Sequence, residues 1–179
     1  TYIVLGNQVR LSSMNAVFRQ RIESLYVSFE NLLKARAFTL ASIPKGMPER
    51  GIYLFSEGDD HLYVGRSNSI RKRLGQHGRL SSKDKSAPFA FKLARESTGN
   101  IKASYKTDGS RSELLKTSEF RRAFETAISR VRTLDVRVVE EAEPLCQALL
   151  VLSCINTRYM VCSWTGGTTH VQESADSNM

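Results

Sequence analysis

The chain lacks any apolar run of the roughly 18 residues that a membrane-spanning helix needs. Residues 1–11 also lack the charged start, long apolar centre and small-residue cleavage site of a signal peptide. Internal repeats and low-complexity blocks are missing too. Since 41% of the 179 residues are hydrophobic and 25% are charged, the composition is that of a folded globular protein. These features predict a cytoplasmic protein and argue against a membrane protein.

Cysteine is scarce as well. Cys146, Cys154 and Cys162 form no CxxC pair, and three thiols cannot close into a complete set of disulfides. Steps of eight residues suit no standard pattern of zinc ligands. The sequence therefore favours reduced thiols over a disulfide framework or a zinc site.

Negative charge is the scarcer sign: 18 Asp and Glu stand against 26 Lys and Arg, for a formal net charge of +8. Residues 66–106 carry eleven Lys or Arg and only two acidic residues, Asp84 and Glu96. A concentrated positive patch attracts polyanions and releases their counterions, so nucleic acid is the natural partner. The alternative is a basic surface that only keeps the protein in solution.

The length fits one well-packed domain with an extension. Apolar spacing, turn residues and prolines divide the chain into successive elements. These are a helix over 13–37, a boundary at 43–48, hairpin strands at 51–55 and 61–65, helices over 68–77, 88–95 and 118–131, a strand over 134–139, a helix from 144 to about 152, and a loose polar tail from 166.

The predicted hairpin carries two tyrosines. With its turn centred on Gly58, Tyr53 lies opposite Tyr63. Side chains alternate across a strand, so both phenols point to one face and are close enough to share a site. The alternative is that both are ordinary packing aromatics of a half-buried sheet.

The helix over 68–77 is predicted to start at Asn68 as its cap and to bury Ile70 and Leu74. Arg73 and His77 are four residues apart, which places them one above the other at the edge of the packed face. A histidine in such a basic helix is commonly a surface residue.

Residues Gly51-Ile-Tyr53 and Tyr63-Val-Gly65, followed by Arg73 and His77, stand in the order of the motifs of the GIY-YIG nuclease family, which the chain resembles. The resemblance implies an α/β (α+β) fold with a small, mainly antiparallel three-stranded sheet flanked by helices. It implies a nuclease domain over 49–165, which leaves an N-terminal helical extension over 1–48 and the tail over 166–179.

The resemblance also implies hydrolysis of DNA with one divalent ion, Mg²⁺ or Mn²⁺. In that scheme Tyr53 activates or positions the attacking water, Tyr63 holds the same network and Arg73 neutralises the scissile phosphate. His77 supports proton transfer or contacts a phosphate. A tyrosine with its usual pKa of about 10 is a poor base, but a basic site or a metal favours its phenolate, and the same setting keeps His77 active near neutral pH.

The metal-binding glutamate of the family is missing. One alignment of the segment 140–151 puts Gln147 at that position, and another puts Val151 there. Neither replaces a carboxylate, although Gln147 has a neutral oxygen to offer a hard cation. Glu143 is the nearest acid on the same helical face and is the reserve metal ligand, whereas its place before Pro144 equally suits a helix cap.

Three functions are compatible with these features. The first is a metal-dependent DNA endonuclease of restriction, phage or genome-defence type, for which a homodimer that cuts both strands is compatible with the sequence. The second is a catalytically silent DNA-binding module, favoured by the altered acid position. The third is an unrelated basic protein that binds RNA or ribosomes, with the Tyr53 and Tyr63 pair as a stacking platform.

Overall fold

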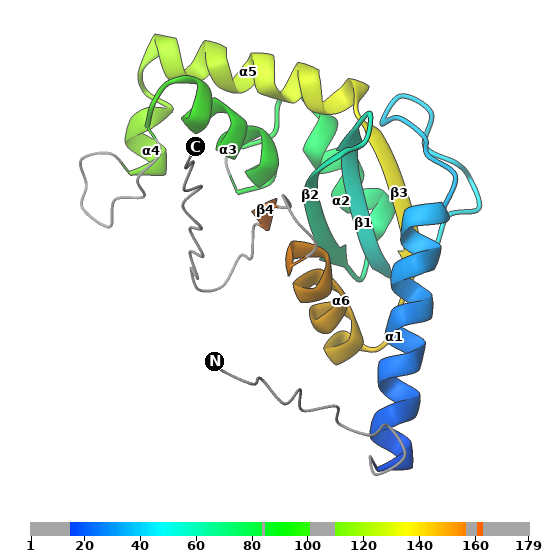
Figure 1. Ribbon diagram of the computed structural model, residues 1–179. Coiled ribbons are helices and arrows are strands. Elements are labelled where there is room, and N and C mark those ends of the chain that lie inside the picture. Colours follow the sequence, from blue (N-terminus) through cyan, green and yellow to red (C-terminus); the bar gives the residue numbers. More distant parts are fainter. Residues whose placement is uncertain (1–14, 84, 101–109, 157–160, 163–179) are drawn as a thin grey trace, which may run out of the picture.

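The computed structural model describes residues 15–83, 85–100, 110–156 and 161–162, with the backbone alone at 155, 156, 161 and 162 (Figure 1). Ten elements follow one another along these residues. They are α1 (Ala16–Lys34), β1 (Gly51–Glu57), β2 (Asp60–Ser67), α2 (Ile70–Gly78), α3 (Pro88–Ser97), α4 (Arg111–Leu114), α5 (Ser118–Thr133), β3 (Asp135–Glu140), α6 (Pro144–Asn156) and β4 (Val161–Cys162). No helix in this part of the chain is long and apolar enough to cross a membrane.

The sheet has the strand order β3-β1-β2-β4. The central strand β1 is antiparallel to both β2 and β3, while the two-residue β4 runs parallel to β2. The predicted α/β fold, a small and mainly antiparallel three-stranded sheet flanked by helices, is therefore confirmed. The short β4 is an addition that the sequence pattern did not indicate.

Alternate residues of β1 pack on opposite faces of this sheet. Tyr53 and Phe55 face the layer of α2, α3 and α5, where aromatic residues such as Phe89 and Phe120 fill the core. Ile52 and Leu54 face α1 and α6 and pack with aliphatic residues, among them Leu32, Val64 and Leu150. The predicted helices thus cover both faces, and each face has a core of its own.

The hairpin register differs from the prediction. Tyr53 lies opposite Gly65, and Tyr63 lies opposite Phe55. Two features shift the pairing by two residues: the turn lies between Glu57 and Asp60, and the register slips between Phe55 and Ser56 as at a β-bulge. Because a shift of two residues preserves the side-chain face, the tyrosines are diagonal neighbours on one face instead of direct partners.

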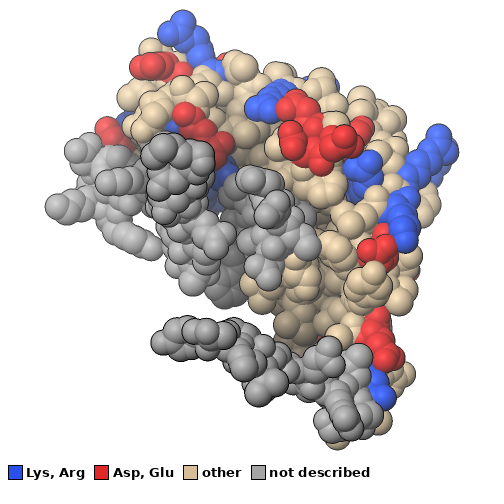
Figure 2. All heavy atoms as spheres, in the orientation of Figure 1, with Lys and Arg blue, Asp and Glu red and all other residues tan. Residues whose placement is uncertain are grey.

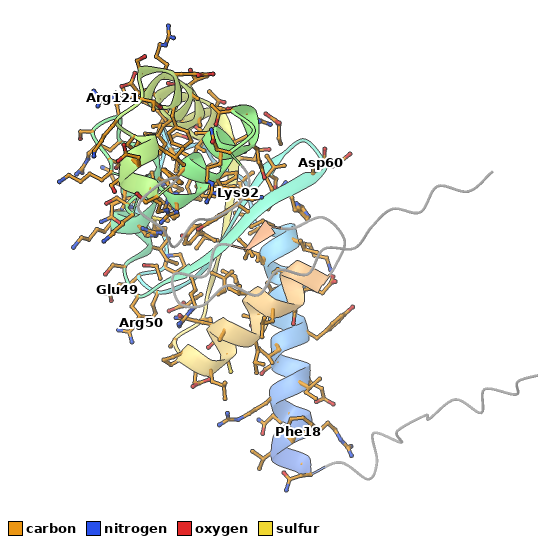
Figure 3. All side chains as sticks on the ribbon, turned by 90° about the vertical axis from the view of Figure 1, so that its left-hand side faces the viewer. Phe18, Glu49, Arg50, Asp60, Lys92 and Arg121 are labelled. Carbon is orange, nitrogen blue, oxygen red and sulfur yellow. The ribbon has the colours of Figure 1, made fainter. Side chains whose placement is uncertain are left out.

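Helix α1 begins after Asn15, whose side chain accepts hydrogen bonds from the amides of Val17 and Phe18. Its C-terminal half packs on the sheet through Leu32, but its N-terminal half leaves Phe18 exposed beyond the domain (Figure 3). The extension therefore packs on the main domain over only part of its length. The predicted tail over 166–179 lies outside the described residues, and the division into domains stays a prediction.

Helix α2 begins at Ile70, so the prediction of Asn68 as its cap is wrong. Ser69 occupies the cap position and makes no side-chain capping bond. Asn68 has another partner, because its Oδ1 accepts a hydrogen bond from Gln147 Nε2 at 3.2 Å. The predicted buried stripe of Ile70 and Leu74 is confirmed, since both are fully buried.

Candidate functional site

The glycines of both hairpin motifs make room for the site. Tyr53 lies across Gly65, where any Cβ atom would collide with the Tyr53 phenol. Gly51 has a φ of 147°, and a Cβ there would collide with the carbonyl oxygen of Val139 on β3. Glycine at these two positions therefore lets three strands and the Tyr53 ring pack closely.

A hydrogen-bonded network centres on the Tyr53 hydroxyl. Arg73 Nε lies 3.3 Å from Tyr53 Oη, and His77 Nε2 lies 3.0 Å from the same oxygen. An arginine can only donate, so Tyr53 Oη accepts from Arg73 and is free to donate its own proton to His77. The structure thus brings together three of the residues that the sequence singled out, from β1 and from two successive turns of α2.

Tyr63 lies beside this network. Its ring centroid is 6.3 Å from that of Tyr53 and 5.5 Å from that of His77. On its other side it stacks on Phe89 at 4.7 Å with an interplanar angle of 20°. Phe89 was not foreseen as part of the site, because its place beside Tyr63 depends on how α3 docks on the sheet.

Tyr53 and His77, with Tyr63 beside them, are shielded from solvent, and this changes their acid–base properties. Tyr53 is 1% exposed, Tyr63 is 1% exposed and His77 is 0% exposed. Burial raises the pKa of Tyr53, with Tyr63 adding to the rise and Arg73 opposing it. Burial, reinforced by the charge of Arg73, lowers the pKa of His77 to about 3. Both groups are therefore neutral at pH 7.

Three expectations from the sequence are wrong as a result. The basic surroundings do not favour a Tyr53 phenolate, because the desolvation of a buried phenolate outweighs the attraction of Arg73. His77 does not titrate near neutral pH and does not lie at the edge of the packed face, since it is fully buried. Its Nδ1 has no hydrogen-bond partner within the described residues.

Arg73 is the one permanent charge in the network, and it is held at several points. Its Nη1 donates to Gln76 Oε1 at 3.3 Å and to the carbonyl oxygen of Ser86 at 3.1 Å. With Nε directed at Tyr53, Nη2 makes no hydrogen bond to any residue that the structure describes. Arg73 therefore keeps donors available for an anion next to the Tyr53 hydroxyl.

Gln147 lies where β2 and β3 leave the sheet. It is 1% exposed, and its Nε2 donates to Asn68 Oδ1 at 3.2 Å and to the carbonyl oxygen of Glu141 at 2.8 Å. Both amide hydrogens are therefore used to join α6 to the segments that follow the two strands. In this structure Gln147 is a buried polar clamp between three parts of the chain.

Glu143 is placed as a helix cap, and Val151 has no carboxylate. Glu143 is exposed, and its carboxylate accepts from the amides of Leu145 at 3.1 Å and Cys146 at 2.7 Å, as the cap of α6 does. Hydrogen bonding to Cys146 and Leu145 lowers the pKa of Glu143. Val151 belongs to the aliphatic core against β1.

The residues in these places do not fit a hard divalent ion. Gln147 points its amino group at two oxygens, and the Glu143 carboxylate is occupied at a helix end. Across residues 15–83, 85–100, 110–156 and 161–162, no group of three His, Cys, Asp or Glu side chains is placed to hold a metal. Among the described residues, Cys146 and Cys154 are not joined in a disulfide.

The exposed side of α2 is basic without any acid. Arg71 and Lys72 are exposed there, Arg66 precedes the helix and Arg79 follows it. A groove beside it is lined by Met47, Pro48, Glu49, Ser69, Ile70, Arg71 and Lys72. Glu49 and Arg50 lie together at the start of β1 (Figure 3). Four residues of the predicted basic segment thus lie on or beside α2, the helix that carries Arg73, and Lys102 and Lys106 lie outside the described residues.

The outer side of α5 differs from α2. Glu119 and Glu125 alternate there with Arg121 and Arg122, all exposed. Figure 2 shows acidic and basic side chains interspersed over this helix at the top of the molecule. Positive charge is therefore less compensated by neighbouring acids on α2 than on α5.

Residues 49–130 match the family model described as the GIY-YIG catalytic domain. No curated protein and no solved structure gives a significant match to the chain. The matched residues contain Tyr53, Tyr63, Arg73 and His77 and end within α5, so Glu143 and Gln147 of α6 fall beyond them.

Proposed function

Because residues 49–130 match the GIY-YIG catalytic domain, we propose that this chain is a nuclease of that family, an endonuclease that hydrolyses phosphodiester bonds of DNA. The observation that carries the proposal is the Tyr53 hydroxyl held between Arg73 Nε and His77 Nε2. A partly buried, fixed guanidinium beside a hydroxyl that can exchange protons suits the attack of water on a phosphate.

Arg73 would bind the scissile phosphate. In a guanidinium the Nε–H bond and one Nη2–H bond point in the same direction, so an oxygen bound at Nη2 lies close to the Tyr53 oxygen that Nε contacts. As the water attacks, negative charge grows on the phosphoryl oxygens, and the guanidinium stabilises it more in the transition state than in the ground state.

Tyr53 and His77 would move the proton of the attacking water. Tyr53 Oη accepts that proton while its own proton passes to His77 Nε2, so the phenol never becomes a full phenolate. The relay agrees with the raised pKa of Tyr53, which disfavours the anion. The imidazolium that forms is costly beside Arg73, and it must return its proton once the bond is cut.

A divalent ion would add charge to this chemistry. Nucleases of the family generally depend on such an ion, which stabilises the oxygens of the reacting phosphate. No step is assigned to it, because the Gln147 amide and the Glu143 cap do not fit a hard cation. Mg²⁺ and Mn²⁺ are the ions to test. A role in restriction, phage biology or genome defence is proposed from the resemblance to the family.

The second candidate function is a DNA-binding module that does not cut. The observation in its favour is Gln147, a neutral residue at a position where a carboxylate was expected. Both hydrogens of its side-chain amide are used in hydrogen bonds to Asn68 and Glu141. Such a module would keep the basic side of α2. Its binding to DNA would depend on salt concentration but would need no divalent ion.

Conversion of supercoiled plasmid to nicked or linear DNA in Mg²⁺ or Mn²⁺ tests the proposal. Tyr53→Phe keeps the buried ring but removes the hydroxyl, and Arg73→Ala removes the guanidinium. Tyr26→Phe, at an exposed position of α1, makes the same change away from the site. Each of the two site variants is expected to lower the rate by at least roughly a hundredfold, with Tyr26→Phe unchanged.

The outcomes separate the two functions. Cutting by the native chain that the two site variants abolish supports the endonuclease. Salt-dependent DNA binding without cutting, in either ion, supports the module. Cutting that survives Tyr53→Phe would show that this network is not the reaction centre.

A further inference from the structure

Arg73 can reach Tyr53 and a phosphate only if its long side chain is held in one orientation. An arginine side chain loses about 2 kcal/mol of rotamer entropy when it is fixed, so something must hold it. Two oxygens of the chain do so from the side opposite Tyr53: the carbonyl of Ser86 and the side-chain Oε1 of Gln76.

The backbone of Gln76 is held by its surroundings. Gln76 follows Arg73 by three residues on α2 and is partly buried, and its main-chain carbonyl oxygen accepts a hydrogen bond from Ser82 Oγ at 2.6 Å. Residues three apart on a helix are neighbours on its surface, so the Gln76 amide lies beside the guanidinium. Within the described residues the side chain hydrogen-bonds to Arg73 and not to the Tyr53 hydroxyl or His77, so it acts on the network through Arg73.

We propose that Gln76 is a positioning residue for Arg73: its neutral amide oxygen orients the guanidinium toward Tyr53 without compensating its charge. This inference rests on the proposed function, because orientation matters only if Arg73 meets a phosphate. The neutrality of Gln76 is as important as its length. A carboxylate in its place would hold Arg73 more firmly but would reduce the positive charge that the phosphate meets.

Three variants separate orientation from charge. Gln76→Glu keeps the length and the acceptor and adds a charge, whereas Gln76→Ala removes the acceptor. Gln20→Glu makes the same charge change on the exposed side of α1 and is the matched control. For each variant, kcat, KM, the midpoint of thermal unfolding and the exchange of the Arg73 Nε–Hε proton by NMR are measured.

Gln76→Glu is expected to lower kcat by roughly tenfold to a hundredfold, with little change in KM and an unfolding midpoint at or above that of the native chain. Gln76→Ala is expected to lower kcat similarly and to speed the exchange of the Arg73 Nε–Hε proton. Gln20→Glu should match the native chain in every measurement. If Gln76 had only a structural role, the kcat of Gln76→Glu would instead follow its unfolding midpoint and would not fall while that midpoint is maintained.

The NMR signal keeps this inference separate from the proposed function. If the native chain does not cut DNA, the proposed function fails, yet faster Arg73 exchange in Gln76→Ala still shows that Gln76 holds the guanidinium. Unchanged Arg73 exchange in Gln76→Ala overturns the inference whatever the cutting assay gives. Native kcat in Gln76→Glu overturns it as well.

Discussion

The two faces of the central strand β1 serve different purposes although their residues alternate along the same few positions. Tyr53 and Phe55 pack in a layer of aromatic rings that also encloses His77. The Tyr53 hydroxyl forms hydrogen bonds with two side chains of α2, Arg73 and His77. Ile52 and Leu54 enter an aliphatic layer against α1 and α6. A change on the aliphatic face therefore affects stability, while a change on the aromatic face affects the chemistry of buried polar groups.

The strongest test of this difference is Leu54→Ala. Leu54 is fully buried, so its truncation is expected to lower the free energy of unfolding by about 2–5 kcal/mol. The rate of DNA cutting per folded molecule should stay at the native value. Urea unfolding and a cutting assay on the folded fraction measure the two effects, and a large loss of rate in the folded fraction would break the contrast between the faces.

Gln147→Glu tests the buried polar residue of α6, on the same side of the sheet as the aliphatic core. The new carboxylate would face Asn68 Oδ1 and the carbonyl of Glu141 in place of an amino group that donates to both. The expected loss is about 1–3 kcal/mol in the free energy of unfolding. It grows as pH rises through the raised pKa of the new carboxyl, since the protonated form can still donate one hydrogen bond.

Gln147→Met is the control, because it has a similar length and no charge to titrate. Urea unfolding of both variants at pH 5 and pH 8, with and without Mg²⁺, gives the comparison. If Mg²⁺ stabilised Gln147→Glu and restored cutting, position 147 would be a metal site that the native amide has closed.

His77 sharpens the contrast through pH. Its pKa is lowered to about 3 in the folded chain and is about 6.5 in the unfolded chain, so unfolding takes up a proton between these values. The stabilising effect of the neutral imidazole is complete above pH 6.5 and declines as pH falls toward 3, by about 1.4 kcal/mol for each pH unit.

His77→Gln removes this dependence while it leaves a hydrogen-bonding group near Tyr53. Denaturant unfolding from pH 7 to pH 4 should therefore show a shallower loss of stability in the variant. His61→Gln is the comparison, because His61 is only partly buried, and its pKa is lowered by burial and Arg137 while Asp59 and Asp60 oppose the shift. Equal slopes in the native chain and His77→Gln would show that His77 is not held neutral.

Local patterns in the sequence determined a large part of this molecule. Alternation and turn residues placed β1, β2 and β3, and apolar spacing placed α1, α2, α3, α5 and α6, because these signals depend on residues a few positions apart. The grouping of Tyr53, Arg73 and His77 was expected from the resemblance to the GIY-YIG family, and the structure brings these three side chains together.

The tertiary structure alone decided the rest. A bulge shifted the tyrosine pairing by two residues, and the docking of α3 placed Phe89 on Tyr63. Burial then set the direction of the pKa shifts of Tyr53 and His77, against what the basic sequence around them indicates. Long-range packing likewise joined Gln147 to Asn68. Desolvation and hydrogen bonding depend on which distant segments meet, and no local pattern of residues contains that information.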